Sequence, residues 1–266
     1  MAATQRQGIV IDDFGGKGEV LVLVHGLGGS SNTWYPEAQV LKRDLHVLAY
    51  DLAGAGRSPL GEAITVARHV ADLMEVIRGA GAERVHLGGH SFGTIICQHF
   101  AALYPGQVAS LALLGAFPAP PAAARGALKE RAAKVRAEGM HAIADAIVAG
   151  GISQDSKVNQ PAVAAFVREC IMAQTAEGYA RNCEALAAAE PADLTRIKCP
   201  VLLLTGEEDR TAPVDVARAM ASALAQATVA PLAGCGHWAP IERAKQVNYA
   251  LTVFYARQRN HGRAAS

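Results

Sequence analysis

A serine between two glycines is the first feature of this sequence that indicates chemistry. Ser91 lies in the run GHSFG at positions 89–93, directly after an apolar strand-like run and directly before an apolar helical run. A turn of this kind presents the serine oxygen at a helix N-terminus, where negative charge is favoured, and the flanking glycines leave room for the tight backbone. We predict that Ser91 is a nucleophile, against the alternative of an ordinary serine in a glycine-rich turn.

A serine hydroxyl needs a base that removes its proton. Of the nine histidines, His237 is the best placed, because it lies in GCGHW at 234–238, between the last predicted strand and the last predicted helix. Loops at the carboxyl ends of parallel strands collect catalytic groups. His90 adjoins Ser91 but is expected to point elsewhere, and His25 suits a role in shaping the loop that follows the first buried strand.

The base must in turn be oriented by a carboxylate. Asp209 lies in the loop after the apolar run 201–204, whereas Glu207 and Glu208 are expected to point to solvent. The alternative is an acidic turn or helix cap, a role that Asp215 is also placed to take. We predict that Asp209 completes a triad with Ser91 and His237.

A glycine-rich loop, HGLGG at 25–29, follows the buried run Val20–Val24. Such a loop lets backbone amides approach a reacting carbonyl group, and the N–H groups of Leu27 and Phe92 are the predicted oxyanion donors. One such donor contributes roughly 2.7–4 kcal/mol in the transition state. A phosphate-binding loop is the alternative, but the lysine of that motif is missing. The second glycine-rich stretch, DLAGAGRS at 51–58, is expected to support the site.

Short β-branched and leucine-rich runs alternate with longer alanine-rich segments, which predicts an α/β fold with a mostly parallel sheet and helices on both faces. We expect strands at residues 19–24, 45–50, 84–88, 108–114, 201–205 and 228–232, preceded by a short hairpin near 8–12. We expect the intervening helices at residues 32–42, 64–79, 92–104, 214–225 and 244–257.

The alternation breaks after residue 114. Residues 117–192 are alanine-rich without strand-like runs, and a segment this long is too long for a loop. We expect helices there at 125–138, 141–148, 161–173 and 179–189. The predicted organisation is an α/β core of residues 1–116 and 193–266 with a helical lid, residues 117–192, over the sheet.

The composition excludes several classes of function. The chain has 266 residues, 51% hydrophobic and 18% charged, with a formal net charge of +1. It lacks a basic patch for nucleic acid, an apolar run that could span a membrane, and a secretory signal pattern. The five cysteines are odd in number and lack paired spacing, so we expect reduced thiols, no metal site and a cytoplasmic location. The predicted partner is a small-molecule ester or lactone, and a homo-oligomer is compatible with the sequence.

Together these five motifs, in the order Ser, Asp, His, resemble the α/β-hydrolase superfamily over nearly the whole chain. Within it, the segments 135–146 and 177–185 look like those of 3-oxoadipate enol-lactonases, although related carboxylesterases share the core motifs. The resemblance implies hydrolysis of a small lactone that carries carboxylates, in the breakdown of aromatic compounds, without any cofactor.

Such a substrate would need cationic groups that face the pocket. The candidates are Arg125, Arg131, Arg136 and Arg181, and the alternative for each is a solvated position on a helix surface. The candidates to line an apolar acyl pocket are Trp34, Phe92, Phe117 and Trp238, and the alternative for each is ordinary packing. Three other functions remain open. The end of the chain also resembles hydrolases of meta-cleavage products, which cut a carbon–carbon bond. A ligand-binding receptor and a cofactor-free haloperoxidase use the same fold.

Overall fold

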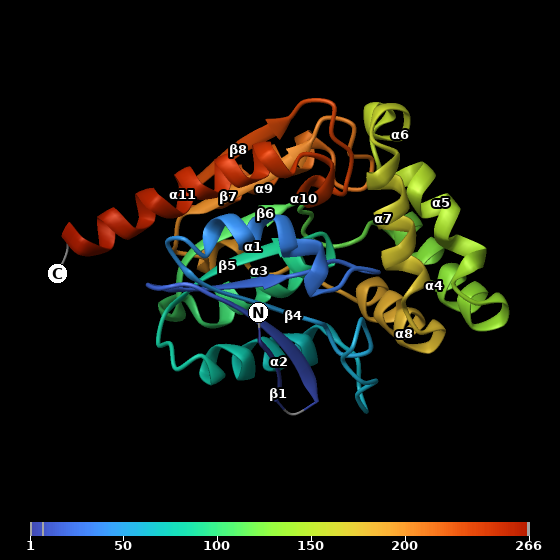
Figure 1. The fold of residues 1–266 in the computed structure, drawn as a ribbon, viewed down its shortest axis with the longest axis horizontal. Coiled ribbons are helices and arrows are strands. Elements are labelled where there is room, and N and C mark those ends of the chain that lie inside the picture. Colours follow the sequence, from blue (N-terminus) through green and yellow to red (C-terminus); the bar gives the residue numbers. More distant parts are fainter. Residues whose placement is uncertain (1, 7, 265–266) are drawn as a thin grey trace.

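The computed structural model describes residues 2–6 and 8–264, and in this part of the chain eight strands form one sheet (Figure 1). The strand order is β1-β2-β4-β3-β5-β6-β7-β8, in which β3 to β8 run parallel while β1 and β2 are antiparallel. The strands are β1 Ala2–Arg6, β2 Ile9–Gly15, β3 Val20–Val24, β4 His46–Tyr50, β5 Val85–His90, β6 Val108–Leu114, β7 Val201–Gly206 and β8 Ala227–Leu232.

The central strands are apolar on both faces, as a parallel sheet covered by helices on both sides requires. Every residue of β3, β5 and β7 is buried. All six predicted core strands are present, with ends that differ by at most two residues. The expected hairpin is longer than the segment proposed for it, because β1 and β2 pair from Arg6 and Ile9 outward.

Helices cover both faces, which confirms the predicted α/β architecture. One face carries α1 (Tyr35–Leu41) and α11 (Ala244–Ala264), and the other carries α2 (Val66–Gly79), α3 (Phe92–Leu103) and α9 (Val214–Ala223). Helix α11 continues seven residues beyond its predicted end and extends past the sheet (Figure 1). Shorter elements are η1 Ser31–Trp34, η2 Pro105–Gln107, η3 Leu194–Arg196 and α10 Ala239–Glu242.

Five helices lie between β6 and β7 and gather at one end of the molecule (Figure 1). We call residues 122–187 the helical insertion. It comprises α4 Ala122–Glu138, α5 His141–Gly151, α6 Gln154–Asn159, α7 Pro161–Met172 and α8 Ala176–Ala187. Four of the five were predicted. The short α6 was missed, although Ser153 caps its first turn by accepting a hydrogen bond from the Ser156 amide.

The helices of the described residues include none that combines the length and the apolar character needed to cross a lipid bilayer. The five cysteines of the chain all carry free, buried thiols. Burial raises the pKa of each of these thiols, so they remain protonated and poorly nucleophilic at neutral pH.

Candidate active site

Ser91 lies on a sharp turn between β5 and α3. It is the one non-glycine residue with a positive φ, 51°, in the described part of the chain, a conformation that costs energy and is typical of functional sites. The flanking glycines make the turn possible. A side chain at Gly89 would stand 2.7 Å from the carbonyl oxygen of Gly93, and one at Gly93 would collide with the carbonyl oxygen of Val24.

The structure brings Ser91, His237 and Asp209 into one line of hydrogen bonds. His237 Nε2 lies 2.7 Å from Ser91 Oγ, and His237 Nδ1 lies 2.8 Å from Asp209 Oδ2. Because a carboxylate can only accept, the ring proton of a neutral His237 is on Nδ1, and Nε2 is free to accept the proton of the serine hydroxyl. The arrangement therefore has the geometry that base activation of a serine requires.

The carboxylate of Asp209 is buried yet ionised. Its Oδ1 accepts hydrogen bonds from the amides of Thr211 and Ala212, both at 2.8 Å. Burial acts to raise the pKa of Asp209, but its interaction with the His237 ring and these hydrogen bonds outweigh it, so the pKa lies below its ordinary value. Asp209 is therefore available as a charged partner for an imidazolium at neutral pH.

The loop that carries His237 is fixed by three further contacts. The His237 amide donates to the carbonyl oxygen of Gly151 at 2.7 Å, and the His237 carbonyl accepts from Nε2 of His90 at 2.7 Å. The buried carboxylate of Glu242 accepts from the amides of Gly236 and Trp238. The same carboxylate also accepts from the Ser153 amide and the Ser156 hydroxyl. The helical insertion and the loop of His237 therefore share one anchor.

The glycine-rich segment 25–29 forms a β-turn whose backbone lies against Ser91. The Gly29 amide donates to the Gly26 carbonyl at 3.0 Å, and Gly28 has a φ of 78°, which suits the third position of a type II turn. A side chain at Gly26 would stand 2.8 Å from Cβ of Ser91. Among the backbone hydrogen bonds of loops and turns in the described residues, neither the Leu27 nor the Phe92 amide is a donor.

A buried polar network supports this turn. His25 Nε2 accepts from the Leu52 amide, so its proton is on Nδ1, which donates to the Gly26 carbonyl at 2.8 Å. Arg57 bridges the carboxylates of Asp51 and Asp12 at 2.8 and 2.7 Å. Burial acts to raise the pKa of Asp51, but the nearby His25 ring and the hydrogen bonds from Arg57 and from backbone amides keep that pKa low. The stretch 51–58 thus holds the turn, as the sequence indicates.

The predicted pocket residues separate into two groups. Trp34 is completely buried in the core on the face covered by α1 and α11, so its expected place in an acyl pocket is wrong. Phe117 and Trp238 belong to the other core, together with Phe92. The Trp238 ring packs 5.6 Å from that of His90, and Trp238 shares its core with residues of the helical insertion.

The predicted substrate arginines are engaged elsewhere. The guanidinium of Arg136 pairs with the carboxylates of Glu177 and Glu184 on the outer surface of the helical insertion. Arg181 donates to the backbone carbonyl oxygens of residues 61 and 62, at 3.1 and 2.5 Å. The expectation that Arg136 and Arg181 bind a substrate carboxylate is therefore corrected, because their donors already have partners.

The two remaining arginine candidates differ from each other. Arg125 donates to the carbonyl oxygens of residues 120, 187 and 189, and so ties together the two ends of the helical insertion. Arg131 lies close enough to Tyr179 and Cys183 for its charge to act on both side chains. In addition, the described residues contain no group of three or more metal-ligating side chains close enough to hold an ion.

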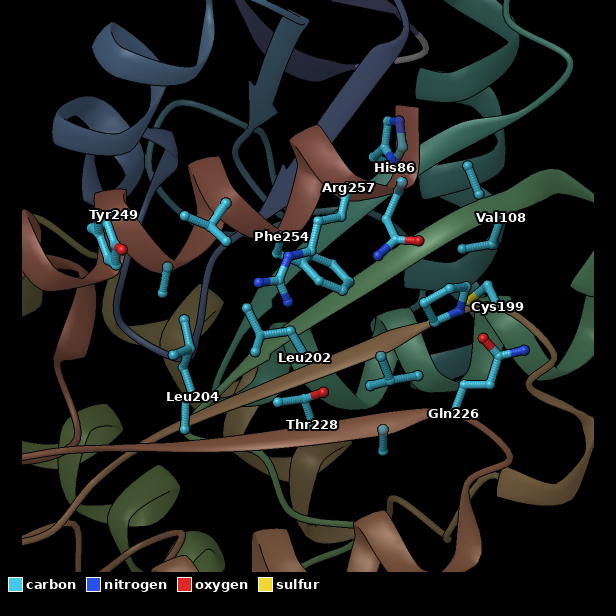
Figure 2. A pocket seen from close by; sticks show the side chains of 18 of the residues that line it. His86, Val108, Cys199, Leu202, Leu204, Gln226, Thr228, Tyr249, Phe254 and Arg257 are labelled. Carbon is cyan, nitrogen blue, oxygen red and sulfur yellow. The ribbon is translucent and has the colours of Figure 1, made fainter. Parts of the chain in front are cut away.

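His86 lines a groove beneath α11 (Figure 2) and belongs to a second serine–histidine–carboxylate arrangement. His86 Nδ1 lies 2.7 Å from Ser110 Oγ, and its Nε2 lies 3.3 Å from Glu19. Ser110 is fully buried within β6 and faces His86 as its direct cross-strand neighbour. A hydroxyl in mid-strand cannot meet a substrate, and the strand amides around it are used by the sheet. We therefore assign this set to packing.

Two residues of the site had not been assigned a role from the sequence. Glu242 anchors the loop of His237, and Gln174 binds the turn at 25–29 from the helical insertion. Each is the first polar residue after a short apolar run, residues 239–241 and 170–173. That position is the weak signal that the sequence carries for them.

Comparisons with known proteins show the family of this chain. The model of the alpha/beta hydrolase family matches residues 21–250. A similar curated protein is "Putative carbamate hydrolase RutD" of Pseudomonas syringae pv. syringae (strain B728a), 32% identical over 253 residues, which cover 90% of this chain and 94% of that protein.

Two solved structures are also similar. A thermophilic esterase from Thermogutta terrifontis has a TM-score of 0.90 and 26% identity, over 94% of this chain and 93% of that one. The enol-lactonase from Burkholderia xenovorans LB400 has a TM-score of 0.87 and 28% identity, over 96% of this chain and 100% of that one.

Proposed function

The chain belongs to the alpha/beta hydrolase family, as its motifs predicted, and from this premise we propose that it is a serine hydrolase that cleaves a carboxylic ester or lactone. The observation that carries the proposal is the line of hydrogen bonds from Ser91 through His237 to Asp209. The resemblance of the chain to an enol-lactonase and to an esterase supports the same class of reaction.

In the first half-reaction, Ser91 Oγ attacks the carbonyl carbon of the substrate while His237 Nε2 accepts the hydroxyl proton. The imidazolium that forms is stabilised by Asp209. The oxyanion of the tetrahedral intermediate is bound by the amides of Leu27 and Phe92, which have no other acceptor in the loops of the described chain. His237 then gives its proton to the leaving oxygen, and the acyl-enzyme is left.

In the second half-reaction, a water molecule loses a proton to His237 and attacks the acyl carbon. Collapse of the second intermediate releases the acid and returns the proton to Ser91. When the substrate is a lactone, the leaving alcohol or enol stays attached to the acyl chain, so a single product leaves the site.

Residues 117–192 act in this proposal as a lid over a core of residues 1–116 and 193–266. The support is that the helical insertion contacts the loops that carry the reacting groups. Gly151 accepts from the His237 amide, and Gln174 contacts the turn at 25–29. Exclusion of bulk water strengthens the electrostatic interactions that stabilise the oxyanion.

The surroundings of Ser91 favour an uncharged substrate. Phe92, Phe117 and Trp238 are buried on this side of the sheet, and three of the four arginines considered as carboxylate ligands are bound to glutamates or to backbone carbonyls. A cation without a partner is what a dianionic lactone would need. Arg131 is the remaining candidate of the four, so we place small neutral esters and lactones ahead of lactones that carry more than one carboxylate.

A carbamate is the second candidate substrate, since the similar protein of Pseudomonas syringae bears the name of a carbamate hydrolase. The same serine attack applies, with the carbonyl carbon bound to nitrogen as well as to oxygen. A carbamate is a weaker electrophile than an ester, so the two are separated by the rates of the acylation step.

The test is a substrate panel of p-nitrophenyl acetate, neutral lactones, an aryl carbamate and a vinylogous 1,5-diketone, with the wild type and Ser91→Ala. We expect turnover of the esters or lactones by the wild type and loss of nearly all of it in the variant. Circular dichroism is the control that the variant is folded. Substantial ester hydrolysis by Ser91→Ala would refute the assignment. Turnover of the diketone alone would replace ester cleavage by carbon–carbon bond cleavage on the same residues.

A further inference from the structure

We infer that Gln174, in the helical insertion, is a positioning residue that holds the turn at 25–29 in the orientation that binds the oxyanion. The inference rests on the proposed function. Gln174 lies between α7 and α8, and only 7% of it is exposed. Its amide group reaches two loops of the core that are 118 to 146 residues away in the sequence.

Every polar atom of the Gln174 side chain has a partner. Nε2 donates to the carbonyl oxygens of Gly29 and Cys170 at 3.2 and 2.9 Å, with the Gly28 carbonyl at 3.4 Å. Oε1 accepts from the Gly56 amide at 3.2 Å. One side chain therefore connects the turn at 25–29, the supporting stretch 51–58 and the end of α7.

The turn is held from two sides. From the core, His25 Nδ1 donates to the Gly26 carbonyl, and from the helical insertion, Gln174 binds the carbonyls at the other end of the turn. The Gly26 carbonyl and the Leu27 N–H belong to one planar peptide group, so the bond from His25 also acts on the direction of that N–H. Gln174 holds the carbonyls that follow Leu27 in the chain, so the Leu27 amide lies between two anchors and its direction depends on both.

Packing reinforces the contact. A side chain at Gly28 would collide with Cδ1 of Ile171 and would stand 3.2 Å from the ring of Tyr179. The cavity that remains here, lined by Leu27, Gln174 and Tyr179 among others, measures about 10 Å³. That is about the space for a single water molecule. Because a substrate cannot enter it, Gln174 acts on the turn and not on the substrate directly.

This location predicts a specific kinetic effect. The oxyanion exists only once the serine has attacked, so an amide that is misdirected weakens the transition state more than the bound substrate. Loss of the Gln174 contacts should therefore lower kcat and leave KM nearly unchanged. Affinity for an inhibitor that reproduces the oxyanion should fall in parallel with kcat.

The experiment compares two variants. Gln174→Met keeps the volume of the side chain without its hydrogen bonds. Gln174→Glu keeps the shape but places a carboxylate oxygen, which cannot donate, against the carbonyl oxygens that Nε2 binds. The matched control is Arg125→Ala, which removes three bonds from the helical insertion to carbonyls elsewhere. The readouts are kcat and KM for p-nitrophenyl acetate and the Ki of benzeneboronic acid, which forms a tetrahedral adduct with an active-site serine.

In both Gln174 variants we expect kcat to fall by about 10- to 100-fold, which is less than the roughly 100- to 1,000-fold loss on deleting an oxyanion donor. The Ki of the boronic acid should rise by a similar factor, and Arg125→Ala should retain the wild-type kcat and Ki. Wild-type kcat and Ki in the Gln174 variants would refute the positioning role, as would an equal loss in Arg125→Ala. A wild-type protein that neither hydrolyses the ester nor binds the boronic acid would instead refute the proposed function.

Discussion

The Nε2 atom of His90 donates a hydrogen bond to the backbone carbonyl oxygen of His237, at 2.7 Å. The residue that precedes the nucleophile in the sequence thus holds the loop of the residue that activates it. Burial lowers the pKa of His90 to about 3, so the ring stays neutral with its proton on Nε2. Its Nδ1 is buried without a partner among the described residues.

Neutral buried histidines make the folded state sensitive to acid. The pKa of His90 is about 3 and that of His69 about 4, against 6.5 in the unfolded chain, in both cases chiefly because of burial. Above pH 6.5 both states are neutral. As the pH falls below 6.5, only the unfolded state gains protons, so stability falls by about 1.4 kcal/mol per pH unit for each histidine.

Urea unfolding between pH 7.5 and 4.5 measures this slope. The variant His90→Gln keeps an N–H donor but cannot titrate. Its free energy of unfolding should therefore fall less steeply with pH than that of the wild type, by the contribution of one histidine, about 1.4 kcal/mol per pH unit. The two proteins should have parallel profiles above pH 7. An unchanged slope in His90→Gln would contradict the neutral state of His90.

Asp209→Asn should lower kcat by about 10⁴-fold, the loss known for a triad aspartate in a serine protease. The amides of Thr211 and Ala212 require an oxygen, so the asparagine turns its NH2 group toward His237 Nδ1. The ring proton of His237 is then forced onto Nε2, and a protonated Nε2 cannot accept the hydroxyl proton of Ser91. Steady-state hydrolysis of p-nitrophenyl acetate measures the loss. The control Asp215→Asn, an exposed carboxylate in α9, should behave as the wild type.

Gly26→Ala should lower kcat by about 100-fold, because its new methyl group would stand 2.8 Å from Cβ of Ser91 and displace the turn that carries the Leu27 amide. The control is Gly126→Ala in α4, where the space around the added methyl group is open. Steady-state kinetics with circular dichroism separates a displaced turn from a failure to fold. Wild-type kcat in Gly26→Ala would show that the turn does not contribute to catalysis.

Glu242→Gln should lower the free energy of unfolding by about 2–3 kcal/mol, since an amide cannot accept all four hydrogen bonds that the buried carboxylate accepts. The comparison is Glu208→Gln, an exposed carboxylate that accepts one bond from the Gln154 amide. It should change stability by less than about 0.5 kcal/mol. Equal urea midpoints for the two variants would contradict the anchoring role of Glu242.

The sheet could be predicted from the sequence because its strands are apolar runs of the right length. The same holds for the candidate site, since Ser91, Asp209 and His237 each lie in the turn or loop that follows such a run, and parallel strands bring their carboxyl ends to one edge. The oxyanion roles of Leu27 and Phe92 rest on the motifs and remain a prediction. These inferences needed only local sequence and the direction of the strands.

The helical insertion resisted the same approach for a physical reason. Helix α4 buries Leu128, Ala132 and Val135, but alanines also occupy its exposed side, so the sequence does not define which face is inward. Arg136 was therefore assigned to the substrate, whereas it points outward to two glutamates. Trp34 was misplaced for a related reason, since its apolar character does not tell which face of the sheet it covers.

The two attachments of the helical insertion restrict how the specificity of this enzyme could be redesigned. The segment between β6 and β7 invites exchange for that of another family member, since both its ends emerge from neighbouring strands. A graft that brings new pocket walls but does not place a backbone carbonyl where Gly151 has its own, or a carboxamide where Gln174 has its own, would leave the loop of His237 and the turn at 25–29 unsupported. Chimeras that transplant those two contacts with the new walls should retain turnover, while those that omit them should fold and bind ligand but react slowly.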